Sequence, residues 1–145
     1  MSGEADAPPP FHLAFPVDDL DAARGFYGGV LGLREGRSSE AWVDFDLFGH
    51  QIVAHLDPDF DVRQARNDVD GDAVPIFHFG LVLDFDAFDT LAARLKKKGA
   101  RFLIEPRTRF EGQPGEQRTM FVRDPAGNAL EFKTFASADR IFATE

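Results

Sequence analysis

The sequence predicts an α+β fold of two βαβββ modules, which together form a concave, open-barrel-like mixed sheet. Three observations predict it. Apolar residues alternate along most of the chain, which marks short strands. Each half contains one segment whose apolar residues have helical spacing. The order of these segments in the first half recurs in the second, and neither half could close a core alone.

The first half begins with a strand and a helix. Residues 11–17 alternate, and the less bulky face of this strand carries His12 and Ala14. Asp18 or Asp19 is then a candidate N-cap for a helix that we expect to end at the Gly28-Gly29 pair. Three strands are expected next, over residues 34–39, 41–48 and 50–56.

The second half repeats this order. Residues 75–84 predict a strand whose less bulky face carries His78 and Gly80. Residues 85–99 predict an amphipathic helix that ends at Gly99. The last strands are expected over residues 100–110, 118–124 and 129–135.

The repeat can be aligned residue by residue. His12 matches His78 at an offset of 66 residues, whereas Gly49 in the last hairpin of the first half matches Gly127 at an offset of 78. The second half therefore carries 12 more residues (78 − 66), which fit a longer loop around residues 107–117.

Both modules are expected to belong to one domain, residues 11–135, because a chain of 145 residues suits one domain. Proline residues predict a flexible tail, and an Asp-rich stretch predicts a solvated linker between the modules. The expected parts are the tail (1–10), module one (11–57), the linker (58–74), module two (75–135) and a C-terminal extension (136–145).

Composition excludes several classes of function. The chain has 25 Asp and Glu against 16 Lys and Arg, and the net charge of −9 argues against a nucleic-acid partner. The absence of cysteine excludes disulfides, thiolate metal sites and cysteine nucleophiles. No apolar run is long enough to span a membrane, and the acidic first residues, MSGEADAPPP, do not resemble a signal peptide. We therefore expect a cytoplasmic protein without a membrane partner.

Two of the four histidines occupy equivalent places in the repeat. His12 and His78 each start the first strand of a module, and the small residues Ala14 and Gly80 beside them would leave room for a metal ion and a ligand. The alternative is a pair of core histidines with satisfied hydrogen bonds. His50 falls at a turn and is expected to be exposed.

Glu131 is the candidate third group. It lies within the apolar run of the last strand, where a carboxylate is costly unless it is paired or bound to a cation. An ion pair of Glu131 with Lys133 or with an arginine is the alternative. Two histidines and one carboxylate form a facial triad, which suits Fe(II) or Mn(II) and leaves coordination positions open.

Three segments resemble the vicinal oxygen chelate superfamily, which includes glyoxalase I, bleomycin resistance proteins and extradiol dioxygenases. They read FHLAFPVDDLDAARGFYGGVLGL, FHFGLVL and MFVRDPAGNALEFKTF, and the resemblance covers roughly residues 11–135. It implies paired βαβββ modules that enclose a metal cavity, with His12, His78 and Glu131 as the metal ligands.

The number of ligands distinguishes branches of this superfamily. Glyoxalase I-type members use four protein ligands, but the repeat places Val53, which cannot bind a metal, where Glu131 would have its partner. Three ligands resemble the extradiol branch, and the chain is most similar to small proteins described as predicted extradiol-type dioxygenases. The resemblance therefore implies Fe(II) or Mn(II), ahead of Zn(II) or Ni(II).

The expected function is a metal-dependent dioxygenase that binds a small substrate of the vicinal-oxygen class, with aromatic compounds among the candidates and with His55 as acid and base. The alternative for His55 is a solvated histidine near the end of its strand. One departure is that ring-cleaving members carry a tyrosine where this chain reads Thr119-Met120-Phe121. Two alternatives stay open: a glyoxalase-like lyase or isomerase, and a non-catalytic protein that binds a drug-like small molecule. The expected partners are the small-molecule substrate and a second copy of the chain in a homodimer.

Overall fold

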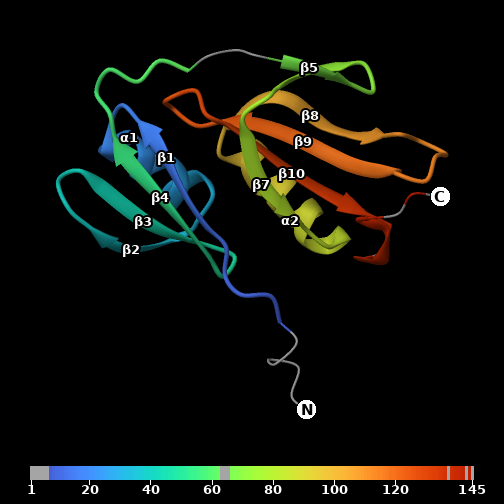
Figure 1. Ribbon diagram of the computed structural model, residues 1–145, viewed down its shortest axis with the longest axis horizontal. Helices are drawn as coiled ribbons and strands as arrows, with labels where there is room; N and C mark the ends of the chain where they lie inside the picture. The colour runs from blue at the N-terminus through green and yellow to red at the C-terminus, as the bar shows by residue number, and fades with distance from the viewer. Residues whose placement is uncertain (1–6, 63–65, 137, 143, 145) are drawn as a thin grey trace. The chain divides into compact units, whose positions relative to one another are not determined.

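The protein is described by a computed structural model that covers residues 7–62, 66–136, 138–142 and 144 (Figure 1). The chain forms two compact units, unit 1 over Met1–Phe60 and unit 2 over Asp61–Glu145. We describe each unit separately. The boundary falls within the predicted linker, and the expectation that both modules share one domain stays a prediction.

Unit 1 is a four-stranded mixed sheet with a helical segment. The strand order is β1-β4-β3-β2, with β1 parallel to β4 and the other neighbours antiparallel. The strands are β1 (His12–Val17), β2 (Arg34–Ser38), β3 (Trp42–Leu47) and β4 (His50–Leu56). All four predicted strands of module one are confirmed.

The helical segment of unit 1 differs from the prediction at its end. It consists of α1 (Leu20–Ala23) followed by the π-helix η2 (Arg24–Val30). Asp19 is the N-cap, since its Oδ1 accepts from the backbone N–H of Ala22 at 3.0 Å. The predicted stop at Gly28-Gly29 is wrong: the helix continues to Val30, and Gly32 with φ of 75° follows.

Packing explains why the two glycines do not end this helix. Tyr27, just before them, is fully buried and packs against three aromatic side chains in tilted and edge-on arrangements. Its ring centroid lies 5.3 Å from Phe15, 4.8 Å from Phe26 and 5.4 Å from Phe45. Contacts of this kind outweigh the weak helix propensity of glycine.

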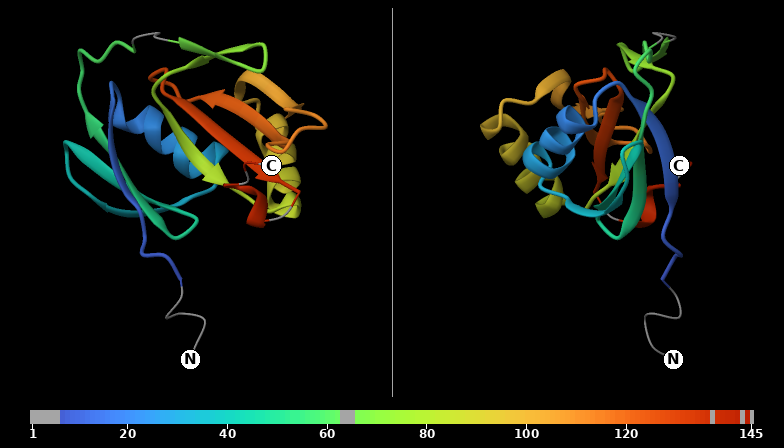
Figure 2. Two further views of the ribbon diagram at one scale, coloured as in Figure 1. Left: turned by 45° about the vertical axis from the view of Figure 1, so that its right-hand side comes forward. Right: turned by 90° about the vertical axis from the view of Figure 1, so that its left-hand side faces the viewer.

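Unit 2 repeats the βαβββ order. Its sheet order is β7-β10-β9-β8, and β7 and β10 are parallel. The elements are β7 (His78–Val82), α2 (Phe85–Lys97), β8 (Arg101–Arg109), β9 (Gln117–Arg123) and β10 (Ala129–Phe135). In each unit the helical segment covers one face of that unit's own sheet (Figure 2). The α+β class and the repeated module are thus confirmed.

Residues 66–75 form a hairpin where the sequence predicted part of a linker. The hairpin consists of β5 (Arg66–Val69) and β6 (Asp72–Pro75). Asp70 and Gly71 have φ of 48° and 87°, the left-handed pair that a tight two-residue turn requires. The Asp70 carboxylate accepts from the backbone N–H of Phe110 at 3.0 Å and from Arg107 at 3.1 Å. Acidic side chains of this stretch therefore fix the hairpin to the end of β8.

The turn between the last two strands has a similar structure in both units. In unit 1, Gly49 has φ of 93° and its N–H donates to Asp46 Oδ1 at 2.7 Å. In unit 2, Gly127 has φ of 100°, and Asp124 Oδ1 accepts from the backbone N–H of Asn128 at 2.8 Å. The Asp and Gly residues that matched in the sequence repeat therefore serve the turn that precedes the last strand.

The ends of the chain contain little regular structure in their described parts. Residues 7–10 of the predicted tail are exposed, and residues 1–6 lie outside the described range. In the C-terminal extension, Ala138–Arg140 form a 3-10 turn. None of the helices within the described ranges is long and apolar enough to cross a membrane.

Candidate metal site

Strand register places the candidate ligands at equivalent positions in the two units. His12 pairs with Gln51 on β4, and His78 pairs with Ala129 on β10. Two residues further along, Ala14 pairs with Val53 and Gly80 pairs with Glu131. The register therefore agrees with the sequence in placing Val53 where unit 2 has Glu131.

His78 and Glu131 lie side by side on one face of the unit 2 sheet. The His78 Nε2 atom is 3.2 Å from Glu131 Oε1. The other ring nitrogen, Nδ1, lies 2.7 Å from the carbonyl oxygen of Pro75. A carbonyl only accepts hydrogen bonds, so Nδ1 carries a proton and Nε2 is the atom directed at the carboxylate.

The second oxygen of Glu131 is held by two other side chains. Thr119 donates its hydroxyl to Oε2 at 2.5 Å, and Arg109 Nη1 lies 3.5 Å from the same atom. Glu131 thus forms the ion pair with an arginine that the sequence offered as the alternative, and it contacts His78 as well. Oε2 is thus held by Thr119 and Arg109, whereas Oε1 faces the other candidate ligand, His78.

Arg109 is a buried arginine that connects this pair to the hairpin. Its exposed fraction is 3%, and its Nη2 lies 3.0 Å from Asp72 Oδ2. Its guanidinium also lies over the ring of Phe121, 5.9 Å from the centroid. Sequence analysis did not identify Arg109 as part of the site. This arginine lies in the segment RTRF, near the end of the strand predicted over residues 100–110.

The contacts of the pair shift both pKa values. The hydrogen bond to Glu131 raises the pKa of His78 above its ordinary value, although partial burial opposes this. Burial raises the pKa of Glu131, but the hydrogen bonds from His78 and Thr119 and the nearby positive charges lower it more, so the net pKa of Glu131 is lowered. Both shifts favour the charged pair.

These shifts predict how the metal-free protein depends on pH. The stabilisation from His78 is complete below its ordinary pKa of 6.5 and is lost as pH rises through its raised folded value. The stabilisation from Glu131 is complete above its ordinary pKa of 4.5 and is lost as pH falls through its lowered value. We expect NMR titration of the His78 ring to give a pKa above 6.5 that falls in Glu131→Gln. An unchanged pKa in Glu131→Gln would contradict the assigned pair.

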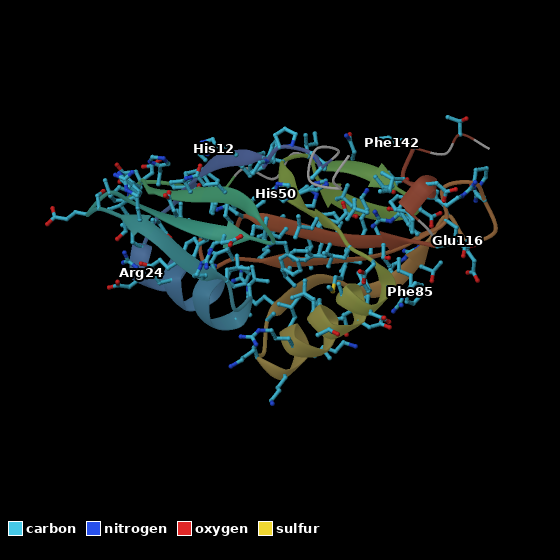
Figure 3. The ribbon with its side chains drawn as sticks, turned by 90° about the horizontal axis from the view of Figure 1, so that it is seen from below. His12, Arg24, His50, Phe85, Glu116 and Phe142 are labelled. Carbon is cyan, nitrogen blue, oxygen red and sulfur yellow. The ribbon has the colours of Figure 1, made fainter. Side chains whose placement is uncertain are left out.

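His12 lies on the open face of the unit 1 sheet, and Figure 3 shows it on the side away from the helical segment that carries Arg24. Its side chain is exposed, and its Nδ1 lies 2.8 Å from Gln51 Oε1. Gln51 Nε2 in turn donates to Asp44 Oδ2 at 3.3 Å. Sequence analysis had not selected Asp44 as part of the site.

The two remaining histidines occupy different places in unit 1. His55 is exposed and pairs with Pro16, four residues along β4 from Gln51. That spacing corresponds to about 13 Å of strand, so His55 lies on the His12 face but outside contact with it. His50 is half-buried, and its Nδ1 accepts from the backbone N–H of Phe11 at 2.8 Å. It thus helps to hold the start of β1 and is less exposed than expected.

Gly80 has a structural role that the sequence analysis did not predict. The sequence suggested that it leaves room for a metal ion. In the structure, a Cβ atom at this position would overlap the backbone carbonyl of Glu131. The absence of a side chain therefore lets β7 approach β10 closely, which brings the His78 and Glu131 side chains together.

The structure thus brings two of the three predicted ligands together, His78 and Glu131. Among the residues described, no group of three or more His, Asp or Glu side chains could by itself hold a metal ion. His12 belongs to unit 1, where its neighbours are Gln51 and Asp44. The assignment of one ion to all three residues remains a prediction.

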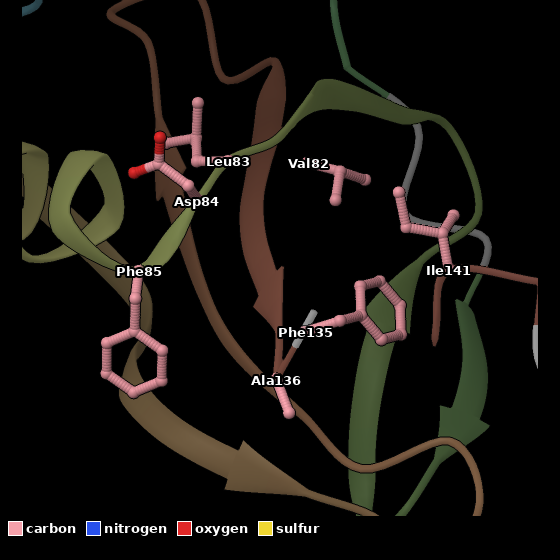
Figure 4. A pocket seen from close by; sticks show the side chains of 7 residues that line it. All are labelled: Val82, Leu83, Asp84, Phe85, Phe135, Ala136 and Ile141. Carbon is pink, nitrogen blue, oxygen red and sulfur yellow. The ribbon is translucent and has the colours of Figure 1, made fainter. Parts of the chain in front are cut away.

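Unit 2 also has an apolar pocket, which is distinct from this pair (Figure 4). Its volume is about 190 Å³, below the range that is typical of ligand sites. Val82 on its wall is four residues, or about 13 Å of strand, from His78. The one acidic side chain of the pocket, Asp84, caps α2 by accepting from Ala87 N–H at 2.8 Å. The pocket therefore offers no free group for catalysis.

Comparisons with known proteins agree with this architecture. A glyoxalase/bleomycin resistance protein/dioxygenase from Alicyclobacillus acidocaldarius is 35% identical, with a TM-score of 0.79 over 92% of this chain and 95% of that chain. The fosfomycin resistance protein FosX from Mesorhizobium loti shares the fold at 22% identity, with a TM-score of 0.61 over 90% of this chain and 94% of that chain. The metallothiol transferase FosB of Shouchella clausii is 26% identical over 130 residues, which are 90% of this chain and 82% of FosB.

The sequence profile of one family spans both modules, since it matches residues 10–132. This range contains His12, His78 and Glu131, and it covers the repeated βαβββ order up to the first part of β10. The chain therefore belongs to the Glyoxalase/Bleomycin resistance protein/Dioxygenase superfamily.

Proposed function

We propose that this protein is a metal-dependent enzyme in which His12, His78 and Glu131 bind one divalent ion. The observation that carries the proposal is the His78–Glu131 pair, in which Nε2 faces Oε1 while Nδ1 and Oε2 are already hydrogen-bonded elsewhere. Metal-binding histidines and carboxylates are oriented by outer contacts of this kind. The two-His, one-carboxylate set favours Fe(II) or Mn(II), with Zn(II) or Ni(II) as further candidates.

The residues around the pair suit this task. A bound divalent ion would supply Lewis-acid chemistry, which lowers the pKa of substrate oxygens that it coordinates. Thr119 and Arg109 hold Oε2 of Glu131, and the hydrogen bonds from His78 and Thr119 lower the pKa of this 7% exposed carboxylate. Phe121 packs edge-on against His78 with ring centroids 4.9 Å apart and restricts the imidazole.

Two reactions are candidates for the chemistry that the enzyme performs on its substrate. The extradiol-type dioxygenase reaction on a small, vicinal-oxygen substrate is the one that the three-ligand set favours. Thr119, in the segment where ring-cleaving members carry a tyrosine, donates to Glu131 instead. The similarity to the metallothiol transferase FosB favours a second candidate, the metal-dependent transfer of a thiol to a small molecule.

One set of assays separates these reactions. Protein loaded anaerobically with Fe(II) or Mn(II) would be given a panel of catechols while oxygen uptake is recorded. The same protein would be given fosfomycin and a small thiol while phosphorus NMR follows the product. Oxygen uptake supports the dioxygenase, and a thiol adduct supports the transferase. A protein that binds no metal and shows neither reaction would overturn the proposal.

His55 stays the predicted acid and base. If it acts on the substrate, His55→Ala should slow turnover while metal affinity is unchanged, since His55 is not among the proposed ligands. A loss of metal affinity would identify it as a ligand instead, and unchanged turnover would remove it from the mechanism. The homodimer and the cytoplasmic location also stay predictions.

A further inference from the structure

Three polar side chains of unit 1 form a hydrogen-bonded series that ends at His12. Asp44 lies on β3, Gln51 on β4 and His12 on β1, so three strands of the sheet contribute one residue each. Asp44 Oδ2 accepts from Gln51 Nε2 at 3.3 Å, and Gln51 Oε1 lies 2.8 Å from His12 Nδ1. All three are on the sheet face opposite the helical segment, as the register requires.

The hydrogen-bonding roles of these groups determine which atom donates at each contact of the series. An ionised carboxylate only accepts hydrogen bonds, so Asp44 must face the NH₂ group of Gln51. The amide oxygen of Gln51 then faces His12, and an oxygen there requires a proton on Nδ1. In neutral His12 the lone pair is therefore on Nε2, the atom that the proposed metal site would use.

Unit 2 also has a proton on Nδ1 of its candidate ligand histidine, but the group that accepts this proton is different. His78 donates from Nδ1 to the backbone carbonyl of Pro75 at 2.7 Å. The residue beside His78 in the register is Ala129, which has no polar side chain. In unit 1 the register partner of His12 is Gln51, and its amide oxygen provides the acceptor that a backbone carbonyl provides in unit 2.

We propose that Gln51 is a positioning residue for His12: oriented by Asp44, its amide oxygen holds His12 in the Nδ1–H tautomer and keeps the Nε2 lone pair for a divalent ion. This inference rests on the proposed function of His12 as a metal ligand. The tautomer itself is a property of the metal-free protein, so it can be measured independently of that function.

The first test measures the tautomer in the metal-free protein. Long-range proton–nitrogen NMR spectra at about pH 8.5, two units above an ordinary histidine pKa, distinguish Nδ1–H from Nε2–H in each neutral ring. We expect neutral wild-type His12 to be Nδ1–H, and we expect His78 to carry a proton on Nδ1, where Pro75 accepts it. In Gln51→Leu, His12 should shift toward Nε2–H while His78 is unchanged, because Pro75 still accepts its proton. An unchanged His12 tautomer would overturn the inference.

A pair of isosteric variants provides the rescue and the control. In Asp44→Asn/Gln51→Glu the donor and acceptor are exchanged between the two positions, the net charge is preserved, and His12 still faces an acceptor. We expect this double variant to keep the wild-type tautomer. Asp46→Asn removes a neighbouring negative charge outside the series, since Asp46 contacts Arg34 and Gly49 instead. It should leave His12 unchanged, and a shift as large as that of Gln51→Leu would overturn the inference.

The second test measures affinity for Mn(II) by calorimetry. Gln51→Leu should weaken binding about tenfold, the usual effect of removing an outer-shell partner of a ligand histidine. The double variant and Asp46→Asn should bind like the wild type. If the tautomer responds as expected but the wild type binds no metal, the proposed function fails and the assignment of the tautomer to Gln51 stands. If the tautomer changes and the affinity for Mn(II) does not, the positioning role is wrong.

Discussion

Replacing His78 with alanine is expected to reduce affinity for Mn(II) or Fe(II) by more than about 100-fold, beyond the usual effect of losing an outer-shell partner. The substitution removes the Nε2 atom that lies 3.2 Å from Glu131 Oε1, and with it one of the three proposed ligands. Calorimetry or metal analysis of anaerobically loaded protein measures the loss, and the wild type should hold about one ion per chain.

The matched control is His55→Ala, which removes an exposed imidazole from outside the proposed ligand set. It should retain wild-type affinity. Circular dichroism and melting of metal-free His78→Ala will establish that the variant is folded. Wild-type affinity in a folded His78→Ala protein would show that the site has been assigned to the wrong residues.

Replacing Arg109 with methionine is expected to lower the free energy of unfolding of the metal-free protein by about 3 kcal/mol. The side chain of Arg109 is 4% exposed, and its loss leaves the carboxylates of Asp72 and Glu131 without their shared positive partner. Removing one member of a buried ion pair is costly because the remaining charge loses a partner that solvent does not replace. His78 still faces Glu131 and Arg107 still contacts Asp72, so each carboxylate keeps one positive neighbour. Urea unfolding followed by circular dichroism measures the effect, which corresponds to a melting temperature lower by roughly 10 °C.

Arg107→Met is the matched control, because Arg107 is two residues away on the same strand and contacts the same Asp72 oxygen at 3.1 Å. Its side chain is 37% exposed, so its ion pairs are screened by solvent and we expect a loss below about 1 kcal/mol. Equal destabilisation by the two variants would show that the burial of Arg109 does not determine how much it contributes to the free energy of unfolding.

Much of the fold was predictable because it depends on short-range patterns. The strands of both modules and the α2 helix follow from alternation, helical spacing and N-capping aspartates, all of which are local in the chain. The same patterns, repeated at an offset of 66 residues and later of 78, identified His12 and His78 as equivalent and Val53 as the counterpart of Glu131. The sequence by itself therefore determined the module order and the three candidate ligands.

Other features were decided by contacts between residues that are distant in the sequence. The burial of Tyr27 among aromatic side chains carries the helix past Gly28, against local propensity. The hairpin at residues 66–75 has a local Asp70-Gly71 turn, but its attachment to β8 depends on ion pairs and hydrogen bonds with Arg107 and Phe110. Local sequence patterns do not encode such contacts.

The surroundings of each ligand were decided in the same way. Arg109 reaches Glu131 from 22 residues away, and Gln51 reaches His12 from 39 residues away. These partners converge only when strands from separate parts of the chain pair in one register, which a single sequence does not specify residue by residue. The sequence thus determined which side chains are candidates to bind a metal. Tertiary structure decided which atoms of those side chains are held by neighbours and which are left for a ligand.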